Sequence, residues 1–140
     1  MTKAAAGCSL LIMVVIGVAA ACDKVPLVAP IASTIAIAAA DVALPVGGST
    51  EVAAYVVEEA GTLVHDGTTV RFTATLGTVE PEEAQTRGGV ATTTFIAGST
   101  PGTAKVVAVS GGAESAAGQG NTIEIVISAP VISAPVISVP

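Results

Sequence analysis

Apolar and polar side chains alternate strictly between Thr69 and Leu76. This stretch, TVRFTATL, carries an apolar residue at every second position, with three threonines and one arginine between them. Successive side chains of a β-strand point to opposite faces of a sheet, whereas those of a helix repeat every 3.6 residues. Eight residues of period two therefore predict a strand with one face in a core and the other in water.

The same alternation recurs in other segments, which are separated by turns. The chain has 15 glycines and 8 prolines, too many breaks for long helices. A short, irregular strand is expected in the acidic stretch VEPEEAQT, residues 79–86. The other predicted strands are Thr34–Ala39, Thr50–Val57, Val90–Ala97, Thr103–Ser110 and Thr122–Ser128. About seven strands in about 95 residues predict an all-β fold, a single immunoglobulin-like sandwich of antiparallel strands.

The alternation also predicts which side chains form the core. Hydrophobic residues make up 51% of the chain but only three are aromatic, so this core is built mainly from Ala, Val and Ile. Glu51, Tyr55 and Glu124 are expected to face water. Besides the apolar residues of 69–76, those expected to face the core are Ile35, Ile37, Val52, Ala54, Val56, Ala91, Thr93, Phe95, Ala104, Val106, Ala108, Ile123, Ile125 and Ile127.

The length and net charge of the chain restrict the classes of protein to which it can belong. A chain of 140 residues has room for one domain with appendages. Its formal net charge is −6, and loss of an N-terminal segment containing Lys3 would leave four basic against eleven acidic residues. Nucleic acid is therefore not an expected partner, because binding it requires lysines and arginines that neutralise phosphates. The acidity instead favours solubility of a valine-rich domain.

The N-terminal segment has the pattern of an export signal. Residues 10–21 carry no charge, Lys3 precedes them, and Asp23 and Lys24 follow. Twelve apolar and small residues fit the helical apolar region of a signal peptide and fall short of the roughly 20 that span a membrane. The three alanines 19–21 before Cys22 resemble the lipobox of bacterial lipoproteins, with Ala where Leu is more usual.

That resemblance implies a lipid anchor. A lipoprotein signal peptidase would cut between Ala21 and Cys22, removing residues 1–21, and the Cys22 thiol would carry diacylglycerol, with acyl chains such as palmitate holding the protein in a membrane. Residues 22–32 contain two prolines and would form an extended tether of at most about 33 Å. Asp23 resembles the signal that retains some lipoproteins in the inner membrane. An ordinary cleaved signal peptide and an uncleaved short anchor remain alternatives.

No cysteine remains after Cys22. Cys8 lies in the segment expected to be removed. The domain would then contain neither a disulfide nor a thiol nucleophile.

Several turn residues suggest a family. Asp66-Gly67 precedes the 69–76 strand, Gly77 follows it, Gly89 precedes the next long strand, and Pro101-Gly102 opens the one after that. With these residues the stretch 66–112 resembles the bacterial Ig-like domain, group 1, the module repeated in invasin and intimin adhesins. The resemblance implies a disulfide-free sandwich over residues 33–128. In the large adhesins such modules are mostly spacers, so the fold alone does not assign a function.

Candidate catalytic and metal-binding groups are few. His65, the only histidine, stands beside Asp66, but the Asp-Gly turn already accounts for that aspartate. Glu80, Glu82 and Glu83 could help to bind calcium, yet they lack the spacing of a known calcium loop and favour a solvated acidic loop. The sequence therefore predicts no catalytic residue, no metal site, no cofactor and no small-molecule substrate.

These observations predict a non-enzymatic, lipid-anchored protein of the bacterial cell envelope, facing the extracytoplasmic side. Its Ig-like module would act as a structural or protein-interaction element. The alternative is an invasin-like surface adhesin that mediates cell adhesion, which the short tether and single module favour less. The expected partners are membrane lipid, through acylated Cys22, and an unidentified protein. The tail, residues 129–140, continues a repeat of the Ala-Pro-Val-Ile-Ser type and is expected to be extended, as a linker or a partner site.

Overall fold

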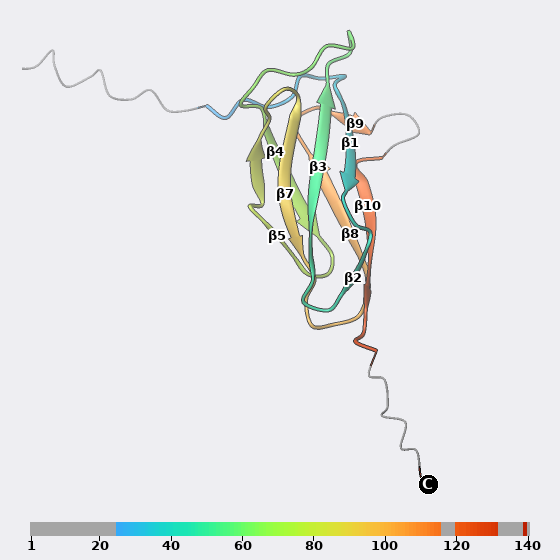
Figure 1. The fold of residues 1–140 in the computed structure, drawn as a ribbon. Coiled ribbons are helices and arrows are strands. Elements are labelled where there is room, and N and C mark those ends of the chain that lie inside the picture. The colour runs from blue at the N-terminus through green and yellow to red at the C-terminus, as the bar shows by residue number, and fades with distance from the viewer. Residues whose placement is uncertain (1–24, 116–119, 132–138, 140) are drawn as a thin grey trace, which may run out of the picture.

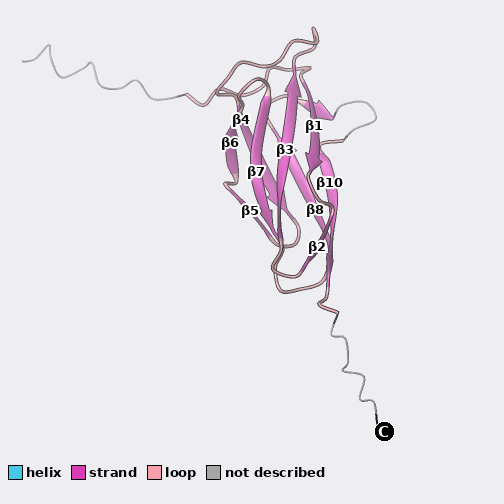
Figure 2. Cartoon of the chain, viewed as in Figure 1, coloured by secondary structure: helices cyan, strands magenta, loops and turns pink. Residues whose placement is uncertain are grey.

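The fold is all-β in the part of the chain that the computed structural model describes, residues 25–115, 120–131 and 139. Figures 1 and 2 show two layers of strands lying face to face. The strands are β1 (Thr34–Ala39), β2 (Ala43–Pro45), β3 (Ser49–Val57), β4 (Thr69–Ala74), β5 (Thr78–Glu80), β6 (Glu83–Gln85), β7 (Val90–Ile96), β8 (Gly102–Val109), β9 (Glu114–Ser115) and β10 (Thr122–Ser128).

The strands form two five-stranded sheets, which confirms the predicted sandwich. One sheet has the order β5-β7-β3-β1-β9 and the other the order β2-β10-β8-β4-β6. The described strands number ten rather than about seven, because two short strands, β5 and β6, replace the one expected near residues 79–86, and because β2 and β9 were not expected. Each of these four has only two or three residues. Two of these also break the expected antiparallel rule, since β9 pairs in parallel with β1 and β2 in parallel with β10.

The core follows the predicted alternation. Every second residue of β3, from Val52 to Val56, is fully buried, and Val70 and Phe72 of the opposite sheet are fully buried too. The buried hydroxyl of Thr93 donates a hydrogen bond of 2.6 Å to the carbonyl of Pro81, which removes the cost of burying a polar group. The expected core residues that are only partly buried are Ile37, Ala74, Leu76 and Ile123.

The segment before β1 is packed against the sandwich. The amide of Thr69 donates to the carbonyl of Leu27 at 2.6 Å. Ala29, which is buried, donates from its amide to Ser110 Oγ at 3.3 Å and accepts from the amide of Gly112 at 3.3 Å. The extended tether expected over residues 22–32 is thus held by the domain from Leu27 onward.

The sandwich has two ends, which are named here by their segments. The N-terminal end consists of residues 27–33, 58–68, 86–89 and 110–112. Hydrogen bonds join the first of these segments to the last and the second to the third, and the amide of Thr69 bonds to Leu27. The C-terminal end consists of residues 45–48, 75–78, 97–102 and Ser128. Figure 1 shows the described N-terminal segment crossing the first end and the chain leaving β10 at the second.

The C-terminal end is also tied together by its backbone. The amide of Val46 donates to the carbonyl of Ser128, and that of Gly47 to the carbonyl of Gly98.

No helix capable of crossing a membrane occurs among the described residues. The helical signal peptide expected over residues 1–21 lies outside them.

Substitution of Phe72 tests whether the core between the two sheets is buried as described. Phe72→Ala should lower the free energy of unfolding by about 3–5 kcal/mol, because the ring is fully buried between the sheets. The matched control is Tyr55→Ala, whose ring is 48% exposed on the outer face of β3 and whose loss should cost about 1 kcal/mol or less. Urea unfolding of both variants measures the difference, and equal losses would contradict this core.

Candidate functional site

The expected lipidation site lies outside the described residues. Ala21 and Cys22 both fall in residues 1–24, so cleavage and acylation there stay predictions. The first described residue, Val25, is 86% exposed, and the packed part of the chain begins two residues later at Leu27. The domain therefore starts only five residues after Cys22.

The Asp66-Gly67 turn lies at the N-terminal end and joins two distant segments. Asp66 Oδ1 accepts a 2.7 Å hydrogen bond from the amide of Gly88, and the amide of Gly67 donates to the carbonyl of Thr86 at 2.8 Å. Gly67 has a φ of +88°, a conformation that glycine adopts without strain. The carboxylate of Asp66 is thus used to hold the 86–89 turn in place.

Two buried threonines complete this junction, and sequence reasoning did not foresee their arrangement. The hydroxyls of Thr68 and Thr86 both donate to the carbonyl of His65, at 2.7 and 2.8 Å. Thr86 Oγ1 also accepts from the amide of Thr68 at 3.1 Å. The backbone carbonyl of His65, rather than its exposed side chain, is therefore the group that takes part in the structure.

Gly89 and Gly77 lie at opposite ends of the sandwich, and both make close contacts. A Cβ on Gly89 would lie 2.8 Å from Leu63 Cδ2, and one on Gly77 would lie 2.5 Å from the carbonyl oxygen of Ile96. Both residues also have positive φ, +75° and +76°. A side chain at either position is thus disfavoured both by the lack of space and by the backbone conformation.

Pro101 and Gly102 lie at the C-terminal end. Gly102 begins β8 and stands opposite Ile127 of β10, so this turn positions the last long strand. Pro101 is exposed.

The acidic group at 80–83 is built into the sheet rather than gathered around a cation. Glu83 Oε1 accepts hydrogen bonds from Arg71 Nη2 at 2.8 Å and Nε at 3.0 Å, across the β4–β6 pair. Glu82 contributes its carbonyl to the amide of Phe72. Among the described residues no group of three His, Cys, Asp or Glu side chains is placed to hold a metal ion.

Two open hollows on the sandwich contain few ionisable side chains. One, of about 190 Å³, lies beside Phe72, Gly77 and Val79, and its ionisable lining residue is Glu82. The other, of about 240 Å³, lies on the outer face of β1 and β3, where alanines surround Glu51 and Tyr55. Neither brings together a nucleophile and a base within hydrogen-bonding reach.

Comparison with known proteins identifies the fold. No protein-family model and no curated protein sequence matches the chain. Among solved structures, the D00-D0 domain of intimin is similar over 71% of this chain, with a TM-score of 0.57 and 15% identity. The Yersinia pseudotuberculosis adhesin InvE is similar over 69% of it, with a TM-score of 0.53 and 25% identity. The sandwich has the Ig-like fold of these intimin and adhesin domains.

The likeness covers one module of longer proteins. This chain spans 50% of the intimin structure and 26% of the adhesin structure. It confirms the resemblance that the sequence of residues 66–112 suggested. The Ig-like module has its turns at the places where the sequence has Asp66-Gly67, Gly77, Gly89 and Pro101-Gly102.

Substitution of Gly77 tests whether the chain packs too closely at this turn of the Ig-like module to admit a side chain. Gly77→Ala should lower the free energy of unfolding more than Gly47→Ala by about 1–3 kcal/mol, because its Cβ would meet the backbone of Ile96. Gly47 is a matched control, since its φ of +75° equals that of Gly77 within one degree and nothing lies within 4 Å of a Cβ there. Denaturant unfolding of both variants gives the comparison, and a smaller loss for Gly77→Ala than for Gly47→Ala would contradict it.

Proposed function

We propose that this chain is a lipid-anchored protein of the bacterial cell envelope, whose Ig-like module is a non-enzymatic spacer or protein-interaction element. The observation that carries the proposal is the placement of the two chain ends. Residues 27–33 are packed at the N-terminal end of the module, while the chain leaves β10 at the C-terminal end (Figure 1). The module therefore separates what is attached at one end from what is attached at the other.

The strands supply the length and rigidity of such a spacer. β3 alone has nine residues, which corresponds to about 30 Å at 3.3 Å per residue. It is hydrogen-bonded to β1 on one side and β7 on the other along most of its length.

The anchor would be close to the module. Leu27 lies five positions after Cys22, and five residue steps of fully extended chain reach about 17 Å. Lipid attached to Cys22 would thus hold the N-terminal end of the module near the bilayer.

The chemistry of the module supports a non-enzymatic role. In the described part of the chain, the one histidine and its neighbouring aspartate serve a turn. One hollow contains Glu82 as its ionisable side chain, and the other contains Glu51 and Tyr55, which are four residues apart on β3. A binding role therefore needs strand faces, edges or the tail, 129–140, rather than a pocket.

A surface adhesin is the second candidate. The two similar structures belong to intimin and to a protein named as an adhesin, which supports a surface-exposed structural module. Protease treatment of intact cells distinguishes the two candidates: digestion of the module supports surface exposure, and full protection contradicts the adhesin.

The anchor is tested by exchanging Cys22. Cys22→Ser should abolish incorporation of labelled palmitate and release the protein from the membrane fraction, because the thiol that carries the lipid is lost. Cys8→Ser is the matched control and should keep both label and location, since Cys8 belongs to the segment removed before maturation. A Cys22→Ser protein that stays with membranes at unchanged mass would contradict the proposal.

A further inference from the structure

Exposed aliphatic side chains gather at the N-terminal end of the module. The ones exposed there are Leu27, Val28, Ile31 and Leu63, and Val25 is exposed two residues before Leu27. They come from two parts of the chain, residues 25–31 and the loop between β3 and β4, which Figure 1 shows at the same end. Contacts fix both parts there, because Val28 and Ile31 lie against the 111–112 turn and Leu63 lies against Gly89.

The turn that carries Ile31 holds this side chain away from the core. The amide of Ser33 donates to the carbonyl of Pro30, so Ile31 and Ala32 occupy the corner of a tight turn. Ala32 has a φ of +68°, a left-handed conformation that is unfavourable for any residue with a Cβ. Ile31 is 88% exposed as a result. Backbone strain of this kind is often kept where it serves a function.

The length of chain before this end indicates what covers it. If Cys22 carries lipid, the bilayer surface lies within about 17 Å of Leu27, the reach of five extended residues. The exposed aliphatic residues all lie on that side of the module.

We propose that the N-terminal end of the module rests on the membrane that anchors it, with Val25, Val28, Ile31 and Leu63 in contact with the lipid interface. This inference rests on the proposed acylation of Cys22. The acyl chains supply the affinity, and the aliphatic residues, entering about 5–10 Å into the headgroup region, orient the module with its C-terminal end and tail away from the bilayer.

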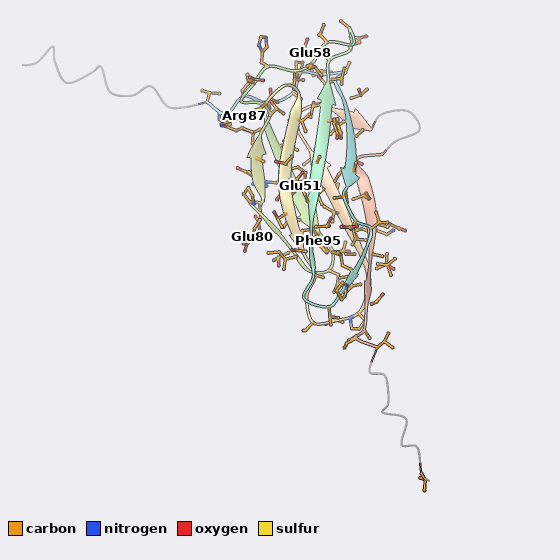
Figure 3. All side chains as sticks on the ribbon, viewed as in Figure 1. Glu51, Glu58, Glu80, Arg87 and Phe95 are labelled. Carbon is orange, nitrogen blue, oxygen red and sulfur yellow. The ribbon has the colours of Figure 1, made fainter. Side chains whose placement is uncertain are left out.

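The charges at this end indicate which lipid it prefers. Among the residues that the structure describes at this end, Glu58, Glu59 and Asp66 carry negative charge and Arg87 carries positive charge. Figure 3 shows Glu58 and Arg87 at this end. Two of the carboxylates have local partners, Glu58 with the hydroxyl of Thr62 at 3.1 Å and Asp66 with the amide of Gly88. A net negative end favours zwitterionic headgroups and is repelled by anionic ones.

The test measures the depth of labels on the lipidated protein in vesicles. Val28→Cys and Ile31→Cys place a thiol at the N-terminal end, and Val42→Cys places one beside β2, toward the other end. Val28 and Val42 are a matched pair, with 50% and 51% exposure. Each new thiol is labelled with an environment-sensitive dye, and the protein is reconstituted into phosphatidylethanolamine–phosphatidylcholine vesicles containing a quencher in the acyl chains.

The labels at 28 and 31 should be quenched several-fold more than the label at 42. Replacing part of the lipid by phosphatidylglycerol should weaken that quenching, because of the acidic residues at this end. Equal quenching at 28, 31 and 42, or stronger quenching with phosphatidylglycerol, would overturn the inference while leaving the anchor intact. The inference would also be overturned if the dyes at positions 28 and 31 were shielded from water in the absence of vesicles, to a degree that grows with protein concentration. A second copy of the protein would then cover this end.

The mass of the purified protein separates failure of the inference from failure of the proposed function. An acylated chain beginning at Cys22 is required before the labels are read. A chain without acyl groups overturns the anchor and this inference together.

Discussion

The orientation of the module relative to its N-terminus depends on a small set of hydrogen bonds around Ala29. The carbonyl of Leu27 accepts from Thr69 at the start of β4, and the backbone of Ala29 bonds to Ser110 and Gly112 just beyond β8. Ser110 Oγ in turn donates to the carbonyl of Thr69 at 2.6 Å, so the same hydroxyl links both strands and the docked segment. Each such bond contributes about 0.5–1.5 kcal/mol. Without them, residues 22–33 would be a free tether and the module would have no fixed side toward a membrane.

The core makes this docking possible by keeping the strand ends in register. Fully buried Phe72 and Phe95, one from each sheet, supply the bulk in a core that otherwise consists mainly of alanine, valine and isoleucine. Small side chains let the sheets lie close together, and the turns at both ends then need glycines at points of close approach, such as Gly77 and Gly89. The docked segment itself bonds to Thr69, Ser110 and Gly112, beside the ends of β4 and β8.

The long strands could be predicted from the sequence because each carries its own signal. Val52, Ala54 and Val56, or Ala104, Val106 and Ala108, mark a buried face within a single segment, and period two needs no knowledge of the partner strand. The short strands β2 and β9 carry no such signal. Two or three residues cannot establish an alternation, and their parallel pairing is decided by which strand edge lies nearby.

The candidate site was predictable only in part, for a similar reason. The Asp66-Gly67 pair predicts a turn from the local sequence alone. The docking of Leu27 and Ala29 could not be predicted, because the two prolines indicate only that the segment is extended. The residues to which it bonds, Thr69 and Ser110, lie about 40 and 80 residues further along the chain. The shared use of the His65 carbonyl by Thr68 and Thr86 likewise depends on a contact between distant turns.

Amide hydrogen exchange of Thr69 in the mature protein tests this account most directly. Its amide donates to the carbonyl of Leu27, so its protection reports whether the segment before β1 is docked. The account predicts that the amide of Thr69 exchanges as slowly as amides of the central strands, such as that of Val56, which donates to the carbonyl of Gly89. Exchange of Thr69 at the rate of an unprotected amide, with Val56 still protected, would mean that the segment is free and that nothing fixes the N-terminal end toward the membrane.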